Sequence, residues 1–168
     1  EHHLRTHPAS STLEQWIEVE HDEAGPVRLH DYDSSAPLVM VTPDADLCQF
    51  SGGGWADEWK WSTDPLTHGL TTLSSLGGLQ PHLQRDPCLL VSPFGPSSEH
   101  AGDVIGVSIA WGGNIRFDVD VRPNAALDGS RELRLRSGAN PLGADYLLDP
   151  ATRFVSPTVA WTWSSSGR

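Results

Sequence analysis

The sequence has 168 residues, a usual length for one domain and enough to bury a hydrophobic core without disulfides or a metal. The formal net charge of −11 excludes a nucleic-acid partner, because binding to phosphates needs a basic surface. No apolar stretch is long enough to cross a bilayer, so we expect no membrane contact. The first residues lack the pattern of a signal peptide, which predicts a cytoplasmic protein or a fragment whose true N-terminus lies upstream.

The first third of the chain contains three predicted strands. Leu13, Ile17 and Val19 alternate with glutamates, and Val27 and Leu29 flank Arg28 in the same way. A period of two is typical of strands that bury one face. Residues 36–41 are almost continuously apolar, which predicts a central strand.

Two runs in the middle of the chain, 103–111 and 114–122, show the clearest alternation. The second run alternates four apolar with four charged residues, namely Ile115, Phe117, Val119 and Val121 against Arg116, Asp118, Asp120 and Arg122. This pattern predicts a half-buried antiparallel strand. The Gly112-Gly113 pair between the runs predicts a tight hairpin that joins them.

The last third continues with short strands. Leu133 and Leu135 alternate with charged residues, and residues 158–163 place Val159, Trp161 and Trp163 on one face. Short strands separated by Gly, Pro and Asp, without a long amphipathic helix, predict an all-β, antiparallel β-sandwich. We expect residues 1–163 to form this single domain, incomplete at its N-terminus, and residues 164–168 to begin a linker.

The sequence contains no pattern typical of a metal site. Cys48 and Cys88 form no CxxC motif, and neither belongs to a cluster with metal-ligand spacing. We predict no metal and no cofactor. The two cysteines are interpreted as buried free thiols, and a disulfide between them stays open.

The most unusual segment spans residues 51–61. If it is extended, Trp55, Asp57, Trp59 and Trp61 share one face, which has the composition of a sugar-binding platform. The alternative is a tryptophan-rich strand packed in the core, and we expect most of the seven tryptophans to be core residues. Asp57 and Glu58 are adjacent, so on a strand they point to opposite faces and cannot flank one glycosidic bond. We therefore predict no catalytic residue in this chain.

Three phrases, in this order, recur in one known family. The first is Gly53-Gly54-Trp55-Ala56-Asp57-Glu58, where the family has Gly-Arg-Trp-Ala-Arg-Glu. The second runs from Gly102 to Asn114 and is similar to Gly-Glu-Val-Tyr-Gly-Phe-Ser-Leu-Val-Trp-Ser-Gly-Asn. The third is Gly138-Ala139-Asn140-Pro141-Leu142, similar to Gly-Ile-Asn-Pro-Phe. With a weaker match around residues 86–88, the chain resembles the N-terminal domain of glycoside hydrolase family 36 enzymes of the α-galactosidase type.

The resemblance implies a supersandwich of the galactose-mutarotase-like kind, followed in the parent enzyme by a catalytic barrel that carries the catalytic aspartates. It implies a homo-oligomer, a carbohydrate partner such as an α-galactoside or a related α-glycoside, and a substrate-binding role for Trp55, Asp57 and Glu58. Gly54, Asp57 and Val39 depart from the family pattern, which loosens the expected galactose specificity. Two alternatives remain open, a stand-alone carbohydrate-binding module and a sandwich that meets no ligand.

Overall fold

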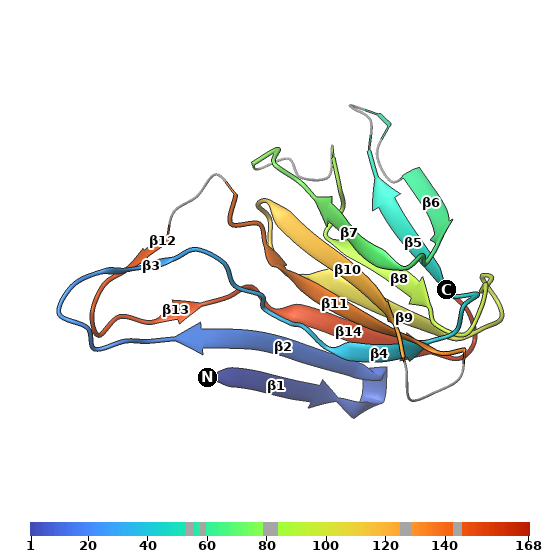
Figure 1. The fold of residues 1–168 in the computed structure, drawn as a ribbon, viewed down its shortest axis with the longest axis horizontal. Coiled ribbons are helices and arrows are strands. Elements are labelled where there is room, and N and C mark those ends of the chain that lie inside the picture. The colour runs from blue at the N-terminus through green and yellow to red at the C-terminus, as the bar shows by residue number, and fades with distance from the viewer. Residues whose placement is uncertain (53–55, 58–59, 79–83, 125–128, 143–145) are drawn as a thin grey trace.

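Figure 1 shows the fold in a computed structural model, which describes residues 1–52, 56–57, 60–78, 84–124, 129–142 and 146–168. The described residues form short strands and a single short 3-10 helix. In chain order the elements are β1 (His2–His7), η1 (Pro8–Ser10), β2 (Thr12–Val19), β3 (Val27–Leu29), β4 (Leu38–Val41), β5 (Asp46–Ser51), β6 (Lys60–Pro65), β7 (Gly69–Ser74), β8 (Cys88–Ser92), β9 (Val104–Ile109), β10 (Ile115–Pro123), β11 (Arg131–Ala139), β12 (Tyr146–Leu148), β13 (Phe154–Val155) and β14 (Val159–Ser164). In the described residues, no helix is long and apolar enough to cross a membrane.

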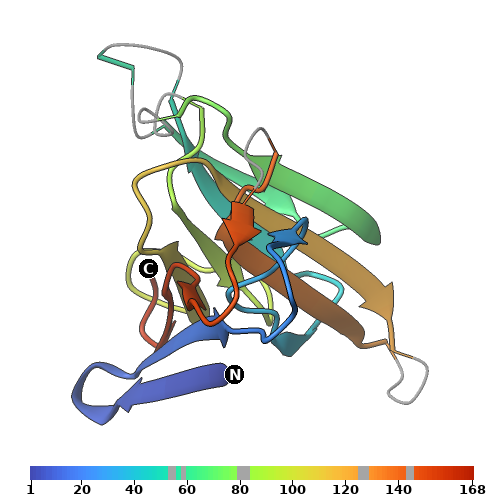
Figure 2. The ribbon, with the colours of Figure 1, turned by 90° about the vertical axis from the view of Figure 1, so that its left-hand side faces the viewer.

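The strands form two main sheets. The first has the order β1-β2-β14-β9-β8-β5-β6, with β13 also paired to β2, and the second has the order β4-β11-β10-β7. A small additional sheet pairs β3 with β12. The paired strands run antiparallel, and one core cluster draws side chains from both main sheets. The prediction of an all-β antiparallel sandwich is confirmed. Figure 2 shows the turn between β1 and β2 projecting away from the body of the domain.

The core lies between β10 and β11 on one side and β8, β9 and β14 on the other. The predicted inward face of β10 is confirmed, because each of its four apolar side chains is at most 1% exposed. Leu133 and Leu135 of β11 are equally buried, as predicted. Across the sandwich they meet Leu89, Val107 and Val159 in the same cluster. Burial of each such side chain stabilises the fold by about 1.5–3 kcal/mol.

The predicted hairpin at Gly112-Gly113 is wrong. β9 pairs with β8 and β14 in the first sheet, whereas β10 pairs with β7 and β11 in the second. Both edges of each strand are therefore occupied by other partners, and residues 110–114 cross from one sheet to the other. The glycines look like a hairpin signal, but the apolar faces of the two strands meet across the core instead of lying in one sheet.

The predicted central strand at residues 36–41 is also corrected. The strand observed there, β4, is shorter and lies at an edge of the four-stranded sheet, paired only with β11 among the described strands. Although β4 is continuously apolar, it is not buried on both faces, since Leu38 is 48% exposed. Several strands escaped prediction because their residues do not alternate clearly, namely β1, β5, β6, β7 and β8.

The tryptophans of the described residues lie mostly outside the core. Of the five in the described residues, Trp161 is buried and Trp16 is half-buried, while Trp61, Trp111 and Trp163 are 44–48% exposed. The expectation of mainly core tryptophans is therefore wrong for these three. Exposed aromatic side chains often mark binding surfaces, so the surfaces around these three tryptophans are candidate binding sites.

Both cysteines are free thiols, as the favoured interpretation predicted. Cys48 is buried in β5, and Cys88 is half-buried at the start of β8. Burial raises the pKa of each thiol, which keeps the reactive thiolate scarce at neutral pH.

Candidate functional site

The segment with the predicted site residues joins β5 to β6. These strands pair in register from Asp46 opposite Pro65 to Ser51 opposite Lys60, so they form a hairpin, and Asp57 lies in its connection, called here the tip. β6 is an edge strand of the first sheet, and all six of its residues are exposed. Trp55 and Glu58 lie outside the described residues. Asp57 is described, with its side chain 46% exposed.

The local backbone differs from the predicted extended strand. Ala56 has a positive φ of 62°, a left-handed conformation that breaks the alternation of a strand. β6 begins only at Lys60, and the Lys60 ammonium lies 2.8 Å from the Asp57 carboxylate. Whether Asp57 and Trp61 share a face stays a prediction, because residues 58–59 between them lie outside the described residues. Asp57 belongs to the tip, and Trp61 to the strand below it.

Trp61 is held in place on the exposed edge strand by three contacts. Its ring meets Phe50 of β5 edge-on, with centroids 4.9 Å apart and planes at 85°. Its indole Nε1 donates to Thr63 Oγ1 over 3.1 Å. The guanidinium carbon of Arg168 lies 4.7 Å from the ring centroid, within the range of a cation–π interaction.

Arg168 reaches Trp61 because the chain after β14 folds back onto the loop of residues 97–102. Gly167 donates its N–H to Gly102, and Arg168 donates to the carbonyl of Ser98 over 3.0 Å. A Cβ on Gly167, whose φ is +94°, would lie 2.5 Å from the Ser98 oxygen, so only glycine fits there. Whether a linker starts in residues 164–168 stays a prediction.

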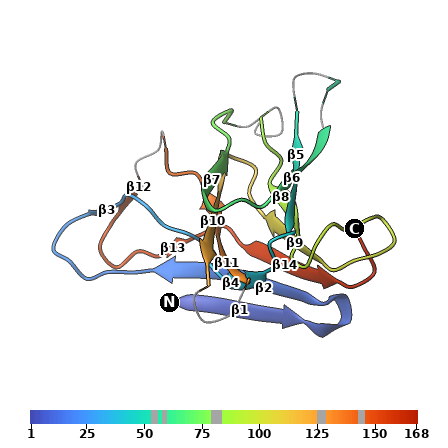
Figure 3. The same cartoon turned by 45° about the vertical axis from the view of Figure 1, so that its right-hand side comes forward.

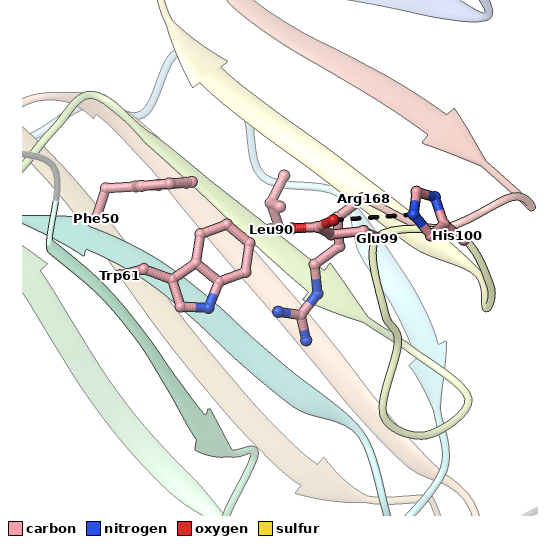
Figure 4. Close-up of a pocket in the computed structure, with 6 residues that line it drawn as sticks. All are labelled: Phe50, Trp61, Leu90, Glu99, His100 and Arg168. Carbon is pink, nitrogen blue, oxygen red and sulfur yellow. Dashed lines mark ion pairs between the residues drawn. The ribbon is translucent and has the colours of Figure 1, made fainter.

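These residues surround an open depression of about 740 Å³, called here the hairpin cleft and lined by Phe50, Trp61, Leu90, Glu99, His100 and Arg168. Figure 4 shows the Trp61 ring lying between Phe50 and Arg168, with the Glu99–His100 pair beyond Arg168. The Glu99 carboxylate lies 3.9 Å from His100 Nε2, and both side chains are exposed. The hairpin cleft offers aromatic surface, hydrogen-bond donors and one carboxylate, a combination suited to a polar ligand.

Glycoside hydrolysis by the common mechanisms needs two carboxyl groups on opposite sides of the scissile bond. Among the described residues that line the hairpin cleft, Glu99 supplies the one carboxylate.

Another group of carboxylates lies on the outer face of the second sheet and is tied to arginines. Asp118 is 2.8 Å from Arg136 and 3.3 Å from Arg116, and Arg116 also pairs with Asp31 over 2.6 Å. Partial burial raises the pKa of Asp33, although Arg136 and Arg116 oppose this effect. Each of these carboxylates is paired with a guanidinium, so the cluster is a set of ion pairs on the outer face of the sheet.

The N-terminal strand holds a group of possible metal ligands that the sequence did not indicate. Donor atoms of Glu1, His3 and Glu18 lie within 4.8 Å of one another. His3 and His7 of this strand are both half-buried. His3 stacks on Trp16 with ring centroids 5.0 Å apart, and its Nε2 lies 3.6 Å from Glu18, which accounts for the group as an aromatic and ionic contact.

Comparison with known proteins identifies the family. The model of the glycosyl hydrolase family 36 N-terminal domain matches residues 1–149. This chain belongs to that family. The match agrees with the three phrases noted in the sequence, and it includes the whole β5–β6 hairpin.

Curated relatives of this family 36 domain are α-galactosidases. Alpha-galactosidase 2 of Pediococcus pentosaceus is 32% identical over 134 residues, which are 80% of this chain and 17% of that protein. Alpha-galactosidase AgaA of Geobacillus stearothermophilus is 30% identical over 133 residues, or 79% of this chain and 17% of that protein. The chain thus spans about a sixth of the length of these relatives.

Solved structures show the same fold. The α-galactosidase from Lactobacillus brevis superposes with a TM-score of 0.82 and 22% identity, covering 98% of this chain and 21% of that one. AgaA of G. stearothermophilus in complex with raffinose superposes with a TM-score of 0.77 and 24% identity, covering 94% and 21%. At this level of identity the likeness establishes the fold alone.

Proposed function

We propose that this chain is the non-catalytic N-terminal domain of a glycoside hydrolase that acts on α-galactosides or related α-glycosides. The domain supports a catalytic barrel, contributes to a homo-oligomer and borders the substrate pocket with Trp55, Asp57 and Glu58. The observation that carries this proposal is the family match over residues 1–149, whose curated relatives are α-galactosidases.

The exposed hairpin supports a role at an interface. All six residues of β6 are exposed, and its outer edge has no partner strand in the described part of the chain. Uncovered edge strands invite pairing with other protein, and a Trp there adds apolar area that association would bury. Covering β6 with a barrel or a second subunit would place the tip around Asp57 against a neighbouring site.

The departures from the family pattern bear on the substrate. Val39, which stands where the family has a carboxylate, lies half-buried in β4 opposite Leu133. A valine cannot accept a hydrogen bond from a sugar hydroxyl, so a contact of that kind is absent at this position. This difference favours the wider class of α-glycosides over galactosides alone.

The test replaces Trp55 by alanine in the enzyme that carries this domain. We expect a raised KM and a loss of about tenfold to a thousandfold in kcat/KM, or about 1.4–4 kcal/mol of transition-state stabilisation. Trp163→Ala is the matched control, because Trp163 is exposed but lies on β14. An unchanged kcat/KM for Trp55→Ala, with the control also unchanged, removes the hairpin tip from the pocket.

A stand-alone carbohydrate-binding module is the second candidate, favoured by the exposure of Trp61, Trp111 and Trp163. The two candidates differ in the size of the native polypeptide. An antibody against this domain should detect a chain of about 790 residues, between four and five times the length of this one, if it belongs to an enzyme like its relatives, because the 134 matched residues are 17% of that protein. A native protein of about 18 kDa, the mass of this chain, would support the module.

A further inference from the structure

The end of the domain opposite β6 carries a second depression. Figures 1 and 3 show the small β3–β12 sheet and β13 at this end, with β6 and the C-terminus at the other. The depression measures about 470 Å³, within the range of roughly 300–1,000 Å³ typical of ligand sites. It is called here the aromatic cleft, and its defining residues are Tyr32, Trp111, Asn114, Asn140, Tyr146 and Phe154.

Phe154 forms the base of the aromatic cleft. It is only 6% exposed, and both tyrosines meet it edge-on with ring centroids 4.8 Å away, Tyr32 at 69° and Tyr146 at 63°. Edge-to-face contacts of this kind fix the orientation of the rings. Tyr146 keeps 43% of its surface exposed, so it presents a fixed aromatic surface to solvent.

Trp111 is exposed and yet constrained. Its indole lies against Gly113, where a Cβ would stand 2.7 Å from Nε1 and 3.1 Å from Cε2. Any side chain at position 113 would push the ring away, so the glycine is needed for this placement. The connection between the two sheets, which contains Trp111, therefore holds a tryptophan with 48% exposure in a defined position beside the tyrosines.

Polar groups converge on the same cleft. Pairing of Ile115 with Ala139 brings the preceding Asn114 beside Asn140, which donates its backbone N–H to the Asn114 carbonyl over 2.8 Å. Asn114 Oδ1 accepts the N–H of Gly78, whereas no hydrogen bond between described residues uses Asn114 Nδ2. The contacts of Tyr32 and Tyr146 with Phe154 use their rings, and no hydrogen bond between described residues uses their hydroxyls, so both hydroxyls can bind a ligand.

The uncharged lining of the aromatic cleft indicates which kind of ligand it can bind. None of the described residues that line it carries a charge, in a chain with a net charge of −11. Burial and the neighbouring Tyr146 raise the pKa of Tyr32, so its hydroxyl stays protonated and can donate at neutral pH. Aromatic faces combined with amide and hydroxyl groups suit the C–H faces and hydroxyls of a neutral sugar.

We propose that the aromatic cleft is a carbohydrate-binding site for a neutral oligosaccharide, with Trp111 and Tyr146 as the stacking surfaces and Asn114 as a hydroxyl-binding group. This site shares no residue with the hairpin cleft and lies at the other end of the domain. This second binding site goes beyond the proposed function, because a substrate pocket at the hairpin tip could exist without it.

The experiment is isothermal titration of the 168-residue chain with raffinose, a neutral trisaccharide, and with galacturonic acid as an anionic sugar. We expect raffinose to bind with a millimolar or lower Kd and galacturonic acid at least about tenfold more weakly. Trp111→Ala and Tyr146→Ala should each weaken raffinose binding at least about tenfold, or about 1.4 kcal/mol. Trp61→Ala and Trp163→Ala, which remove equally exposed rings elsewhere, should leave it unchanged.

Tyr146→Phe provides a variant that keeps the ring and its packing on Phe154, and it should weaken binding about threefold to tenfold through the lost hydroxyl. Failure of raffinose to bind the folded wild-type chain overturns the proposal. So does binding that is lost with Trp61→Ala and kept with Trp111→Ala, which assigns the sugar to the hairpin cleft. Neither result touches the proposed role of Trp55, which is measured by enzyme kinetics.

Discussion

The indole Nε1 of Trp161 donates a hydrogen bond to Ser35 Oγ over 3.0 Å in the buried interior. The same hydroxyl donates to Gln15 Oε1, and the backbone of Ser35 bridges to Ser137 of β11. Trp161 and Gln15 belong to the first sheet and Ser137 to the second. One serine therefore ties the two layers together and satisfies two polar side chains that are each 8% exposed.

Ser35→Ala should destabilise the domain by about 1–3 kcal/mol, because it leaves the Trp161 N–H and the Gln15 amide oxygen without this partner. The free energy of unfolding in urea measures the effect. Ser62→Ala on the exposed strand β6 is the control and should change it by less than about 0.5 kcal/mol. Equal stability of the two variants would show that the buried bond contributes nothing.

The charged cluster on the outer face of the second sheet gives a paired prediction. Asp118 is 4% exposed and accepts bonds from Thr72 and Arg136 over 2.6 and 2.8 Å. Asp118→Asn should lower the free energy of unfolding by about 1.5–3 kcal/mol at pH 7, since bonds to a charged group are lost. Thermal denaturation monitored by circular dichroism measures it.

Asp33→Asn should behave in the opposite way. The pKa of Asp33 is raised in the folded state, chiefly by burial, so its charge is disfavoured by folding and the stability falls as pH rises through the folded pKa. At pH 7 the variant should therefore melt at the same or a higher temperature than the wild type. Below the unfolded pKa of about 3.8 both forms are neutral, and the difference should vanish. A variant that melts several degrees lower at pH 7 contradicts this assignment.

The thiols provide a chemical test of the core. Because burial raises the pKa of Cys48 and Cys88, both should react with iodoacetamide at pH 8 about tenfold or more slowly in the folded chain than in urea. Mass spectrometry counts the added groups. Two groups added in urea without reductant confirm two free thiols, whereas none would reveal a disulfide.

The open edge of β6 predicts self-association. The strand exposes all six residues, Trp61 among them, at the end of the first sheet. We expect the apparent mass in light scattering to rise with protein concentration. Trp61→Lys should suppress the rise, because lysine on an edge strand opposes pairing, and Trp163→Lys should not. A monomer at every concentration tested would exclude association through this edge.

The sequence predicted the fold class well because alternation reports directly on burial. In β10, every second side chain from Ile115 to Val121 faces the core, as expected. The pairing partners of the strands were not predicted correctly, since Gly112-Gly113 has the composition of a hairpin turn but connects two sheets. The local spacing of apolar residues indicates which face of a strand is buried. The neighbours of a strand depend on contacts distant in sequence, as the pairing of β9 with β8 and β14 illustrates.

The candidate site was predicted less completely. Spacing predicted an extended segment over residues 51–61, but Ala56 is left-handed, and no local signal marks an alanine for that conformation. Trp55 and Glu58 remain predictions outside the described residues. The aromatic cleft escaped sequence analysis because its residues come from separate parts of the chain and carry no spacing of their own, as Tyr32, Trp111 and Phe154 illustrate.

The pairing of β2 with β14 sets a condition on how the domain is made. Gln15 lies opposite Val159, so the first sheet joins residues separated by almost the whole chain. Contacts so distant in sequence slow folding, because a long loop must close before they form. During synthesis on the ribosome, the edge of β2 that pairs with β14 would stay unpaired until residue 164 had emerged. We expect this interval to be the period in which the nascent chain depends most on chaperones.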